Sequence, residues 1–578
     1  MSGTPSARGR AADSAATGPV RGFFRGSIDK VAPLEFPEPA RFEEETLVLF
    51  LDSLRRFAAG AIDSARIDEE SAVGDPVIAG LREIGLFGLA IPEAYGGFGF
   101  DAVRTCRVME ELGSIDVAVS TLMGGHSSIG AKGLLLFGTE EQKARFLPDL
   151  ASGESIACFA LSEPNAGSDV HGMKTRADRN EDGRLWTLNG TKFWITNGGV
   201  ARFFTVFART PMAAGRENDI TAFVLSREEP GLSIGREESK LGIRGSSTVE
   251  VVLENVRVPD DQVLGPPGRG FAIAMEILNH GRLGLSAGCV GQAKKIRAAA
   301  AAYARERRQF SRPIASFELV KEKLADMALD VYAMESLVYS TAALVDRGAK
   351  DFSLEAAVAK VFCSEALWRV VNHALQIAGG NGFIREYPYE RFLRDARVNL
   401  IFEGTNEVLR HFIAMAGLKG PRREVDAMRA KLGNPLTALP EVLSFFGKQT
   451  ARAFARDSAP EVEPELRREA TSLEQAVKWL GQASVRALVK HGDSIAERQL
   501  VQQRLADAAI DAAVMAAVLH RAGATLASAA ASEEERKGAL ARARLVHARA
   551  IERVKRNLDA IDDNEDGLVV EIADERES

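Results

Sequence analysis

The sequence predicts a mainly α-helical protein with a small antiparallel β domain near its centre. Long stretches that repeat apolar residues every three or four positions, as helices do, flank one central stretch, 156–262. In that stretch short alternating runs rich in Thr, Val, Phe and Trp predict strands. At 578 residues the chain is also too long for one ordinary hydrophobic core, so several domains are expected.

The elements follow in a simple order along the chain. Residues 1–40 begin with an Ala-, Ser-, Gly- and Arg-rich stretch that lacks the apolar centre of a secretory signal, which predicts a disordered tail. Helical periodicity broken by Gly and Pro predicts a first helical domain at 41–155. After the β domain, long helical patterns return at 263–418, and a more charged helical domain is expected at 419–578.

Composition limits the classes of function. The chain has 73 Lys and Arg against 80 Asp and Glu, a net charge of -7, so no nucleic-acid partner is expected. The four cysteines are far apart and show no ligand spacing, which favours buried thiols and no metal site. No window approaches the roughly 18 consecutive apolar residues that span a bilayer.

The usual one-segment signatures of nucleotide hydrolases, zinc proteases, serine hydrolases and Rossmann dehydrogenases are absent. Five other segments remain, and each alone has an ordinary structural explanation as a turn, a core aromatic, a helix end or a solvated charge. They are FALSEPNAGSD (159–169), WITNGG (194–199), ERRQF (306–310), QIAGGNGF (376–383) and IFEGTNEVLR (401–410).

In this order and at these intervals, the five segments resemble those of the acyl-CoA dehydrogenase family of flavoproteins. The domain after residue 418, with GTNEVLRHFIA and QLVQQRLADAAID, is similar to the extension of the very-long-chain members. The resemblance implies the family fold: a helical bundle, a β domain, a second helical bundle and an extra C-terminal helical domain.

The resemblance also implies the reaction. Such enzymes oxidise the Cα–Cβ bond of an acyl-CoA in fatty-acid β-oxidation and give a trans-2-enoyl-CoA. Glu403 would be the base that removes the α-proton, the hydride would pass to flavin N5, and electrons would go to an electron-transferring flavoprotein. The apolar neighbours Ile401 and Phe402 would raise the pKa of Glu403.

The family pattern assigns further roles to matching positions. Within one subunit the FAD contacts would be Phe159, Leu161, Ser162, Ser168, Trp194 and Thr196. Across a homodimer interface they would be Arg307, Phe310, Gln376 and Gly380, with Thr405 and Glu407 completing the site. Substrate would contact Ser168, Asn279, Arg282 and Gly404. His280 and Gly281 fall outside this predicted site.

Two glycines bear on chain length. In MGGHSSIG, Gly124 and Gly125 fall where shorter-chain relatives carry larger side chains that close the acyl pocket. Removing those side chains would deepen the tunnel, which predicts a long- or very-long-chain substrate.

Several alternatives stay open. The basic amphipathic segment 440–457 would suit peripheral contact with an anionic membrane or packing against the dimer partner. An acyl-CoA oxidase on the same fold and an assembly factor for respiratory complexes are the rival functions. The composition favours a bacterial cytoplasm, with mitochondria as the alternative location.

Overall fold

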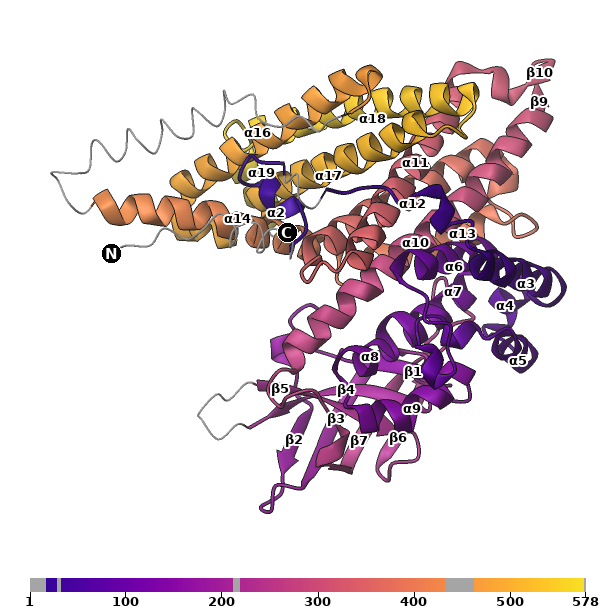
Figure 1. Cartoon of the computed structure of the whole chain (residues 1–578), viewed down its shortest axis with the longest axis vertical. Coiled ribbons are helices and arrows are strands. Elements are labelled where there is room, and N and C mark those ends of the chain that lie inside the picture. Colours follow the sequence, from indigo (N-terminus) through magenta and orange to yellow (C-terminus); the bar gives the residue numbers. More distant parts are fainter. Residues whose placement is uncertain (1–16, 29–32, 212–218, 433–461, 576–578) are drawn as a thin grey trace. The chain divides into compact units, whose positions relative to one another are not determined.

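The computed structural model describes residues 17–28, 33–211, 219–432 and 462–575. It divides into two compact units. The larger comprises Glu38–Val331 and Cys363–Thr405, and the smaller comprises Met1–Pro37, Tyr332–Phe362 and Asn406–Ser578. The predicted fold class, mainly α with a central β domain, is confirmed (Figure 1).

The N-terminal helices of the larger unit begin at polar capping residues. Glu44, Asp63, Asp101 and Asp116 accept backbone N–H groups of the first turns of α3, α4, α6 and α7, and Thr139 forms a capping box at α9. The elements are α3 (Glu45–Ala61), α4 (Ser64–Glu70), α5 (Asp75–Glu83), α6 (Ala102–Ile115), α7 (Val117–Met123), a π-helix (Gly124–Gly130), α8 (Lys132–Phe137) and α9 (Glu140–Ser152).

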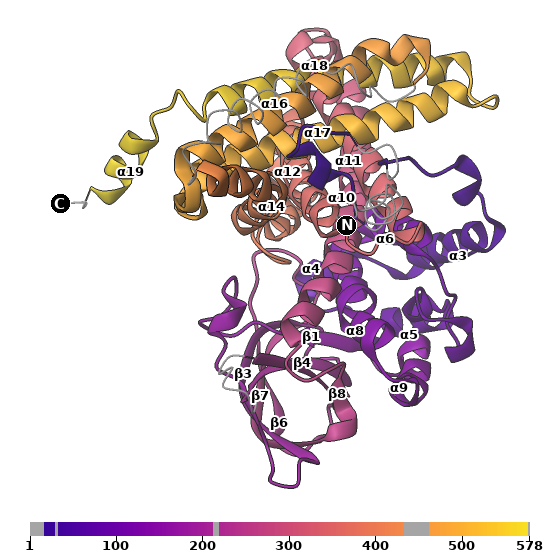
Figure 2. The same ribbon diagram turned by 60° about the vertical axis from the view of Figure 1, so that its left-hand side comes forward.

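The central sheet has the order β6-β7-β3-β2-β4-β5-β8 among the described residues, and β1 pairs with β4. Its strands are β1 (Ala157–Ala160), β2 (Arg176–Arg179), β3 (Leu185–Thr196), β4 (Phe203–Thr210), β5 (Asp219–Ser226), β6 (Leu232–Glu237), β7 (Thr248–Pro259) and β8 (Val263–Leu264). The sheet is mixed and not wholly antiparallel as predicted, because β1 and β2 run parallel to β4. It curves strongly, as Figure 2 shows.

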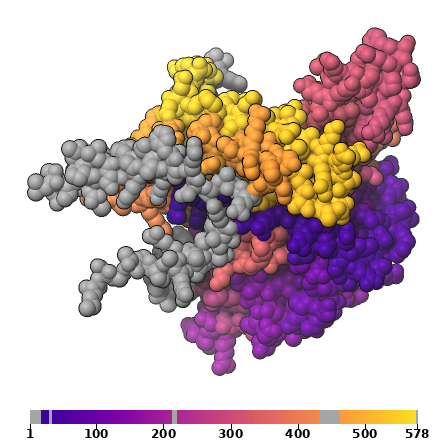
Figure 3. All heavy atoms as spheres, turned by 45° about the horizontal axis from the view of Figure 1, so that its top comes forward, coloured from indigo at the N-terminus to yellow at the C-terminus, as the bar shows by residue number. Residues whose placement is uncertain are grey.

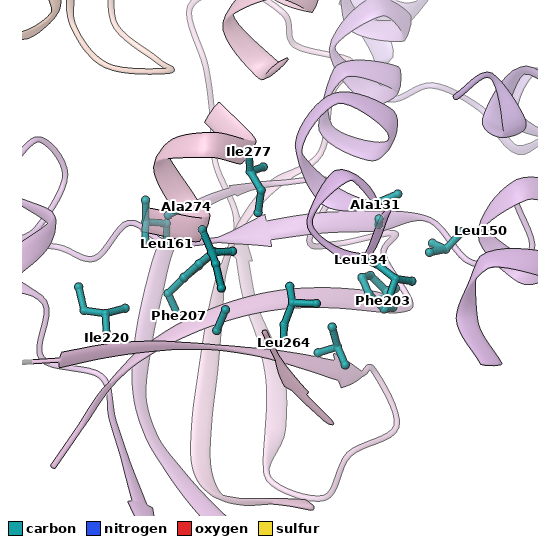
Figure 4. Packing of buried hydrophobic residues seen from close by; sticks show 14 of the residues in the cluster. Ala131, Leu134, Leu150, Leu161, Phe203, Phe207, Ile220, Leu264, Ala274 and Ile277 are labelled. Carbon is teal, nitrogen blue, oxygen red and sulfur yellow. The ribbon is translucent and has the colours of Figure 1, made fainter. Parts of the chain in front are cut away.

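One face of the sheet packs on helices. Phe203 and Phe207 of β4 lie in one buried cluster with Leu134 of α8 and with Ile273 and Ile277 at the start of the helix that follows the sheet (Figure 4). Side chains that alternate along β4 and β5 therefore have a hydrophobic partner on this face. A second buried cluster around Trp186 fills the other face.

Long helices follow the sheet. They are α10 (Gly270–Glu306), α11 (Glu318–Asp346), α12 (Ser353–Ala378) and α13 (Tyr389–Arg397), with the short hairpin β9 (Arg308–Gln309) and β10 (Arg312–Pro313) between α10 and α11. α10 is buried along much of its length, where Gly, Ala and Ser let neighbouring backbones approach closely.

The smaller unit contains α2 (Val20–Phe23), α14 (Asn406–Leu432), α16 (Arg467–His491), α17 (Gln499–Ala527), α18 (Glu533–Asp559) and α19 (Asp566–Asp574). Atoms of α16 and α18 lie side by side in Figure 3. α14 continues without a break past residue 418, where the sequence predicted a domain boundary. α17 is long and apolar enough to cross a membrane, but 67% of its most apolar window is buried inside the protein, as in a core helix.

Part of the predicted disordered tail is packed. Val20, Phe23 and Phe24 are at most 1% exposed, and Val20 N donates a hydrogen bond to Glu355 Oε1 at 2.9 Å. The prediction of disorder was wrong here because these apolar side chains find a buried surface that the local sequence does not reveal. The predicted amphipathic segment 440–457 lies outside the described residues.

Candidate active site

Glu403 occupies the loop that precedes α14. Its φ is +59°, in the left-handed region that non-glycine residues seldom adopt, and Gly404 follows with φ +93°. Arg282 Nε donates a hydrogen bond to the main-chain oxygen of Glu403 at 3.1 Å. A backbone held in this sparsely populated conformation points to a site where the direction of the side chain matters.

Glu403 lines a pocket inside the larger unit, with about 610 Å³ of unfilled space including its open mouth. The wall supplied by α10 forms one stripe at helical spacing: Gly281, Gly284, Leu285, Gly288 and Gln292. The opposite walls are Met109, Val117, Ser120, Thr121, Gly124, Gly125, Ser128, Ile129, Thr196, Ile243, Asn399 and Phe402. Most of this lining is apolar or lacks a side chain, which suits a hydrocarbon chain.

Gly281 belongs to this pocket, although the sequence analysis left it outside the site. A Cβ at Gly281 would lie 2.7 Å from both carboxylate oxygens of Glu403 and 2.5 Å from Ile129 Cγ2. Only a residue without a side chain therefore leaves the Glu403 carboxylate in this position.

Arg282 lies beside Glu403, and Asn279 lies beside Arg282. Arg282 is 6% exposed and donates from Nη1 to Asn279 Oδ1 at 2.9 Å. Burial lowers the pKa of Arg282, while the Glu403 carboxylate acts to raise it. The neighbouring His280 differs, because burial, aided by the charge of Lys132, lowers its pKa to about 3 and keeps it neutral.

The segments FALSEPNAGSD and WITNGG, which contain the predicted FAD contacts of the β domain, are held together by hydrogen bonds. Phe193 N donates to Ser162 O at 3.0 Å, and Lys192 Nζ donates to Leu161 O at 3.1 Å. Lys192 also pairs with Glu163 Oε1 at 2.8 Å, with both side chains almost completely buried. The loop after β1 and the end of β3 are therefore held as one structure.

Trp194 is not a core residue. Its side chain is 57% exposed and its φ is +56°, at a register shift between β3 and β7. Thr196 lines the pocket and Ser168 is exposed, while the ring centroid of Phe159 lies 4.9 Å from that of Phe207 with the two rings tilted by 56°. The structure thus brings Thr196 and Glu403 into one pocket, and it leaves the exposed indole of Trp194 two residues before Thr196.

The residues predicted to meet a partner subunit lie at exposed positions. Phe310 is 88% exposed with φ +50°, and Arg307, Gln376 and Gly380 are also exposed. A Cβ at Gly380 would have no atom within 4 Å. None of these four lines the pocket of Glu403.

The loop after Glu403 supplies the remaining predicted contacts. Gly404 and Thr405 are partly buried, and Glu407 is exposed in the first turn of α14.

Gly124 and Gly125 both line the pocket but differ in the space around them. A Cβ at Gly124 would meet only Met109 Cε at 3.9 Å, whereas a Cβ at Gly125 would lie 2.7 Å from Asn197 Nδ2. Spare room in the pocket therefore lies at Gly124, and Gly125 permits close packing against the end of β3.

Comparisons with known proteins agree with this arrangement. Residues 44–154, 158–256 and 268–418 match the N-terminal, middle and C-terminal domains of acyl-CoA dehydrogenase, and residues 464–575 match the ACAD9/ACADV C-terminal domain. The human very long-chain specific acyl-CoA dehydrogenase, mitochondrial, is 42% identical over 518 residues, which cover 87% of this chain and 78% of that protein. The chain belongs to the acyl-CoA dehydrogenase family.

Solved structures agree with this family fold. The crystal structure of an acyl-CoA dehydrogenase complexed with FAD from Bacillus anthracis has a TM-score of 0.80 and 30% identity, covering 95% of this chain and 94% of that chain. A chain in the structure described as the electron transferring flavoprotein of Acidaminococcus fermentans has a TM-score of 0.62 and 37% identity, covering 65% of this chain and 98% of that one.

The family is FAD-dependent, so the enzyme is an FAD-dependent acyl-CoA dehydrogenase, as the sequence predicted. The residues present fit this cofactor. An exposed indole at Trp194, the pocket-lining Thr196 and the open backbone at Gly380 offer a stacking surface, a hydroxyl and room for close approach. Among the described residues, no three His, Cys, Asp or Glu lie together as metal ligands, and all four cysteines are buried thiols.

Sequence reasoning missed Lys192, Glu163 and Gln292. Glu163 stands inside FALSEPNAGSD and Lys192 stands two residues before WITNGG, so their opposite charges were a usable signal. Gln292 gave no such signal, because a single amide in a helical run rich in Ala and Gly is compatible with either a core or a surface position.

Proposed function

We propose that the enzyme catalyses α,β-dehydrogenation of long- or very-long-chain acyl-CoA to trans-2-enoyl-CoA, with Glu403 as the base. The observation that carries the proposal is the position of Glu403 at the pocket wall, over Gly281 and on a backbone of positive φ. The pocket offers space for an acyl chain and one carboxylate that reaches it from the loop before α14.

A base held in a fixed direction suits the first part of the reaction. The α-proton of a thioester is weakly acidic, so a carboxylate must be close and correctly oriented when it takes the proton. Arg282 holds the main chain of Glu403, and Phe402 and Ile129 limit water around its side chain once substrate fills the pocket. Bound FAD supplies the acceptor for the hydride that leaves Cβ.

The proposed cofactor contacts are those that the family pattern predicts. Phe159, Leu161, Ser162, Ser168, Trp194 and Thr196 would hold FAD in one subunit; Arg307, Phe310, Gln376 and Gly380 would hold it across a homodimer; and Thr405 and Glu407 would complete the site. Asn279, Arg282, Ser168 and Gly404 would contact substrate. The exposed positions of Phe310 and Gly380 support a contact with a second subunit.

The relatives support the proposed chain length and electron acceptor. The human relative is described as very-long-chain specific and mitochondrial, which supports the longer substrates and the alternative location. An electron-transferring flavoprotein is the proposed acceptor, in keeping with the related chain from Acidaminococcus fermentans. The bacterial cytoplasm, the membrane contact of 440–457 and a role in assembly of respiratory complexes stay predictions.

The test compares Glu403→Gln with the parent enzyme. Both should retain flavin, but anaerobic reduction of the flavin by acyl-CoA should slow at least about 100-fold in the variant, because the base is lost. Glu276→Gln is the matched control, since Glu276 is an exposed acid on α10 outside the pocket and its loss should change nothing. If Glu403→Gln reduces as fast as the parent, Glu403 is not the base.

The same preparation tests the oxidase alternative. In air, an oxidase would release one peroxide for each acyl-CoA oxidised, whereas the proposed dehydrogenase should turn over slowly until an electron-transferring flavoprotein is added. Stoichiometric peroxide at full rate would favour the oxidase.

A further inference from the structure

The pocket of Glu403 extends along α10. The α10 residues that line it are spaced three, four, seven and eleven positions beyond Gly281, so they lie on one face of the helix. Gly281 adjoins the Glu403 carboxylate, and Gln292 lies eleven residues further. At 1.5 Å per residue, the pocket wall therefore extends roughly 16 Å from the level of Glu403 to Gln292.

The distal end carries an unusual group. Gln292 is 3% exposed, it lines the pocket, and its Oε1 has no hydrogen-bond partner among the described residues. Thr121, which lines the same pocket, donates its hydroxyl to Val117 O at 2.8 Å and is thus already engaged. A buried acceptor without a donor is costly, whereas an apolar side chain here would suit a plain hydrocarbon better.

We infer that this end of the pocket is a subsite for an acyl chain that carries a hydroxyl group far from the thioester, with Gln292 Oε1 as the acceptor. The inference rests on the proposed function, since it requires an acyl-CoA bound with Cα beside Glu403. Methylene groups cannot donate to Gln292, and a hydroxyl can.

The distance from Glu403 to Gln292 along the pocket wall sets the position of the hydroxyl group on the acyl chain. Staggered C–C bonds of about 1.5 Å advance an extended chain by about 1.3 Å per carbon, so roughly 16 Å corresponds to about twelve carbons beyond Cα. A hydroxyl near carbon 14 would then meet Gln292. A hydroxyl near carbon 8 would lie between Leu285 and Gly288, too far from Gln292 Oε1 to donate a hydrogen bond to it.

The test measures equilibrium binding. Full-length holoenzyme with Glu403→Gln is titrated calorimetrically with terminally hydroxylated and plain acyl-CoAs of 8, 12, 14 and 16 carbons. The hydroxyl should tighten binding about tenfold at one length near 14 carbons and give no such gain at 8. Adding Gln292→Met, which has similar length but no polar atom, should remove the gain and tighten binding of the plain chain several-fold.

Controls separate the inference from the proposed function. Gln142→Met removes another buried amide, bonded to Asp261 O and Val263 O outside the pocket, and should leave the hydroxyl preference unchanged. Gln292→Leu replaces Gln292→Met if the latter loses flavin. The inference is overturned if hydroxylated and plain chains bind with equal affinity at every length, as an ordered water at Gln292 would give. It is also overturned if the preference for the hydroxylated chain survives in Gln292→Met and Gln292→Leu. Failure of hexadecanoyl-CoA to reduce the flavin of the parent enzyme would instead overturn the proposed function.

Discussion

Lys192 Nζ lies 2.8 Å from Glu163 Oε1, and this buried pair ties the loop after β1 to the end of β3. Glu163 also accepts hydrogen bonds from Lys174 N and Thr175 N. Burial lowers the pKa of Lys192 to about 8 against the opposing effect of Glu163. For Glu163, burial acts to raise the pKa, but the charge of Lys192 and these hydrogen bonds outweigh it, so the pKa is lowered.

Breaking this pair from one side should damage the flavin segments. Lys192→Met leaves the Glu163 carboxylate buried without its cation and should lower the free energy of unfolding by about 3–5 kcal/mol. Differential scanning fluorimetry and flavin retention measure the effect. The exposed pair Arg202–Glu228 is the control, and Arg202→Met should cost about 1 kcal/mol or less. Equal losses in both variants would contradict a special role for the buried pair.

Gly281→Ala should impair the reaction with little loss of fold. The new Cβ would lie 2.7 Å from the Glu403 carboxylate, so the side chain must move, and a displacement near 1 Å can cost about 100-fold in rate. Single-turnover reduction of bound flavin by acyl-CoA measures it. Gly60→Ala, at an exposed position of α3 where a Cβ would have no atom within 4 Å, should leave that rate unchanged. An unaltered rate in Gly281→Ala would show that Glu403 does not act from this position.

Gly124→Leu should shorten the acyl pocket selectively. Gly124 has ordinary helical dihedrals and a Cβ there meets only Met109 Cε at 3.9 Å, so the side chain fits and fills pocket space. We expect kcat/KM for hexadecanoyl-CoA to fall at least about tenfold, with that for octanoyl-CoA nearly unchanged. Gly125→Ala should instead impair both substrates, because it meets Asn197. A parallel loss for both chain lengths in Gly124→Leu would refute the role in chain length.

Glu355 should make the smaller unit less stable as pH rises. Burial raises its pKa to about 7 from an ordinary 4.5, so the folded state holds a proton that the unfolded state releases between these values. The stabilisation is full below about pH 4.5 and is lost as pH rises through about 7, a change of about 3 kcal/mol. Urea unfolding at pH 5 and 8 should show that Glu355→Gln reduces this difference.

The exposed Glu552 supplies the control for that experiment, since Glu552→Gln should leave the pH dependence of unfolding as it is in the parent. A pH dependence unchanged in Glu355→Gln would mean that Glu355 does not hold the proton.

The sequence by itself determined the fold class and the family, and it supplied the segments from which the site is proposed. Helical and alternating periodicities are local patterns, so the fold class can be predicted without coordinates. The five motifs, such as IFEGT and WITNGG, keep their order along the chain, so the family can be predicted in the same way. The sequence also predicted Glu403 and Thr196, which share one pocket.

Only the tertiary structure decided which groups face that pocket. Gly281 became part of the site because α10 passes the Glu403 loop, and Gln292 because it lies three helical turns along the same face. Val20 and Phe23 became core residues because a surface distant in sequence covers them. Burial and unpaired hydrogen-bonding groups arise from contacts between residues far apart in the chain, so a local pattern does not contain them.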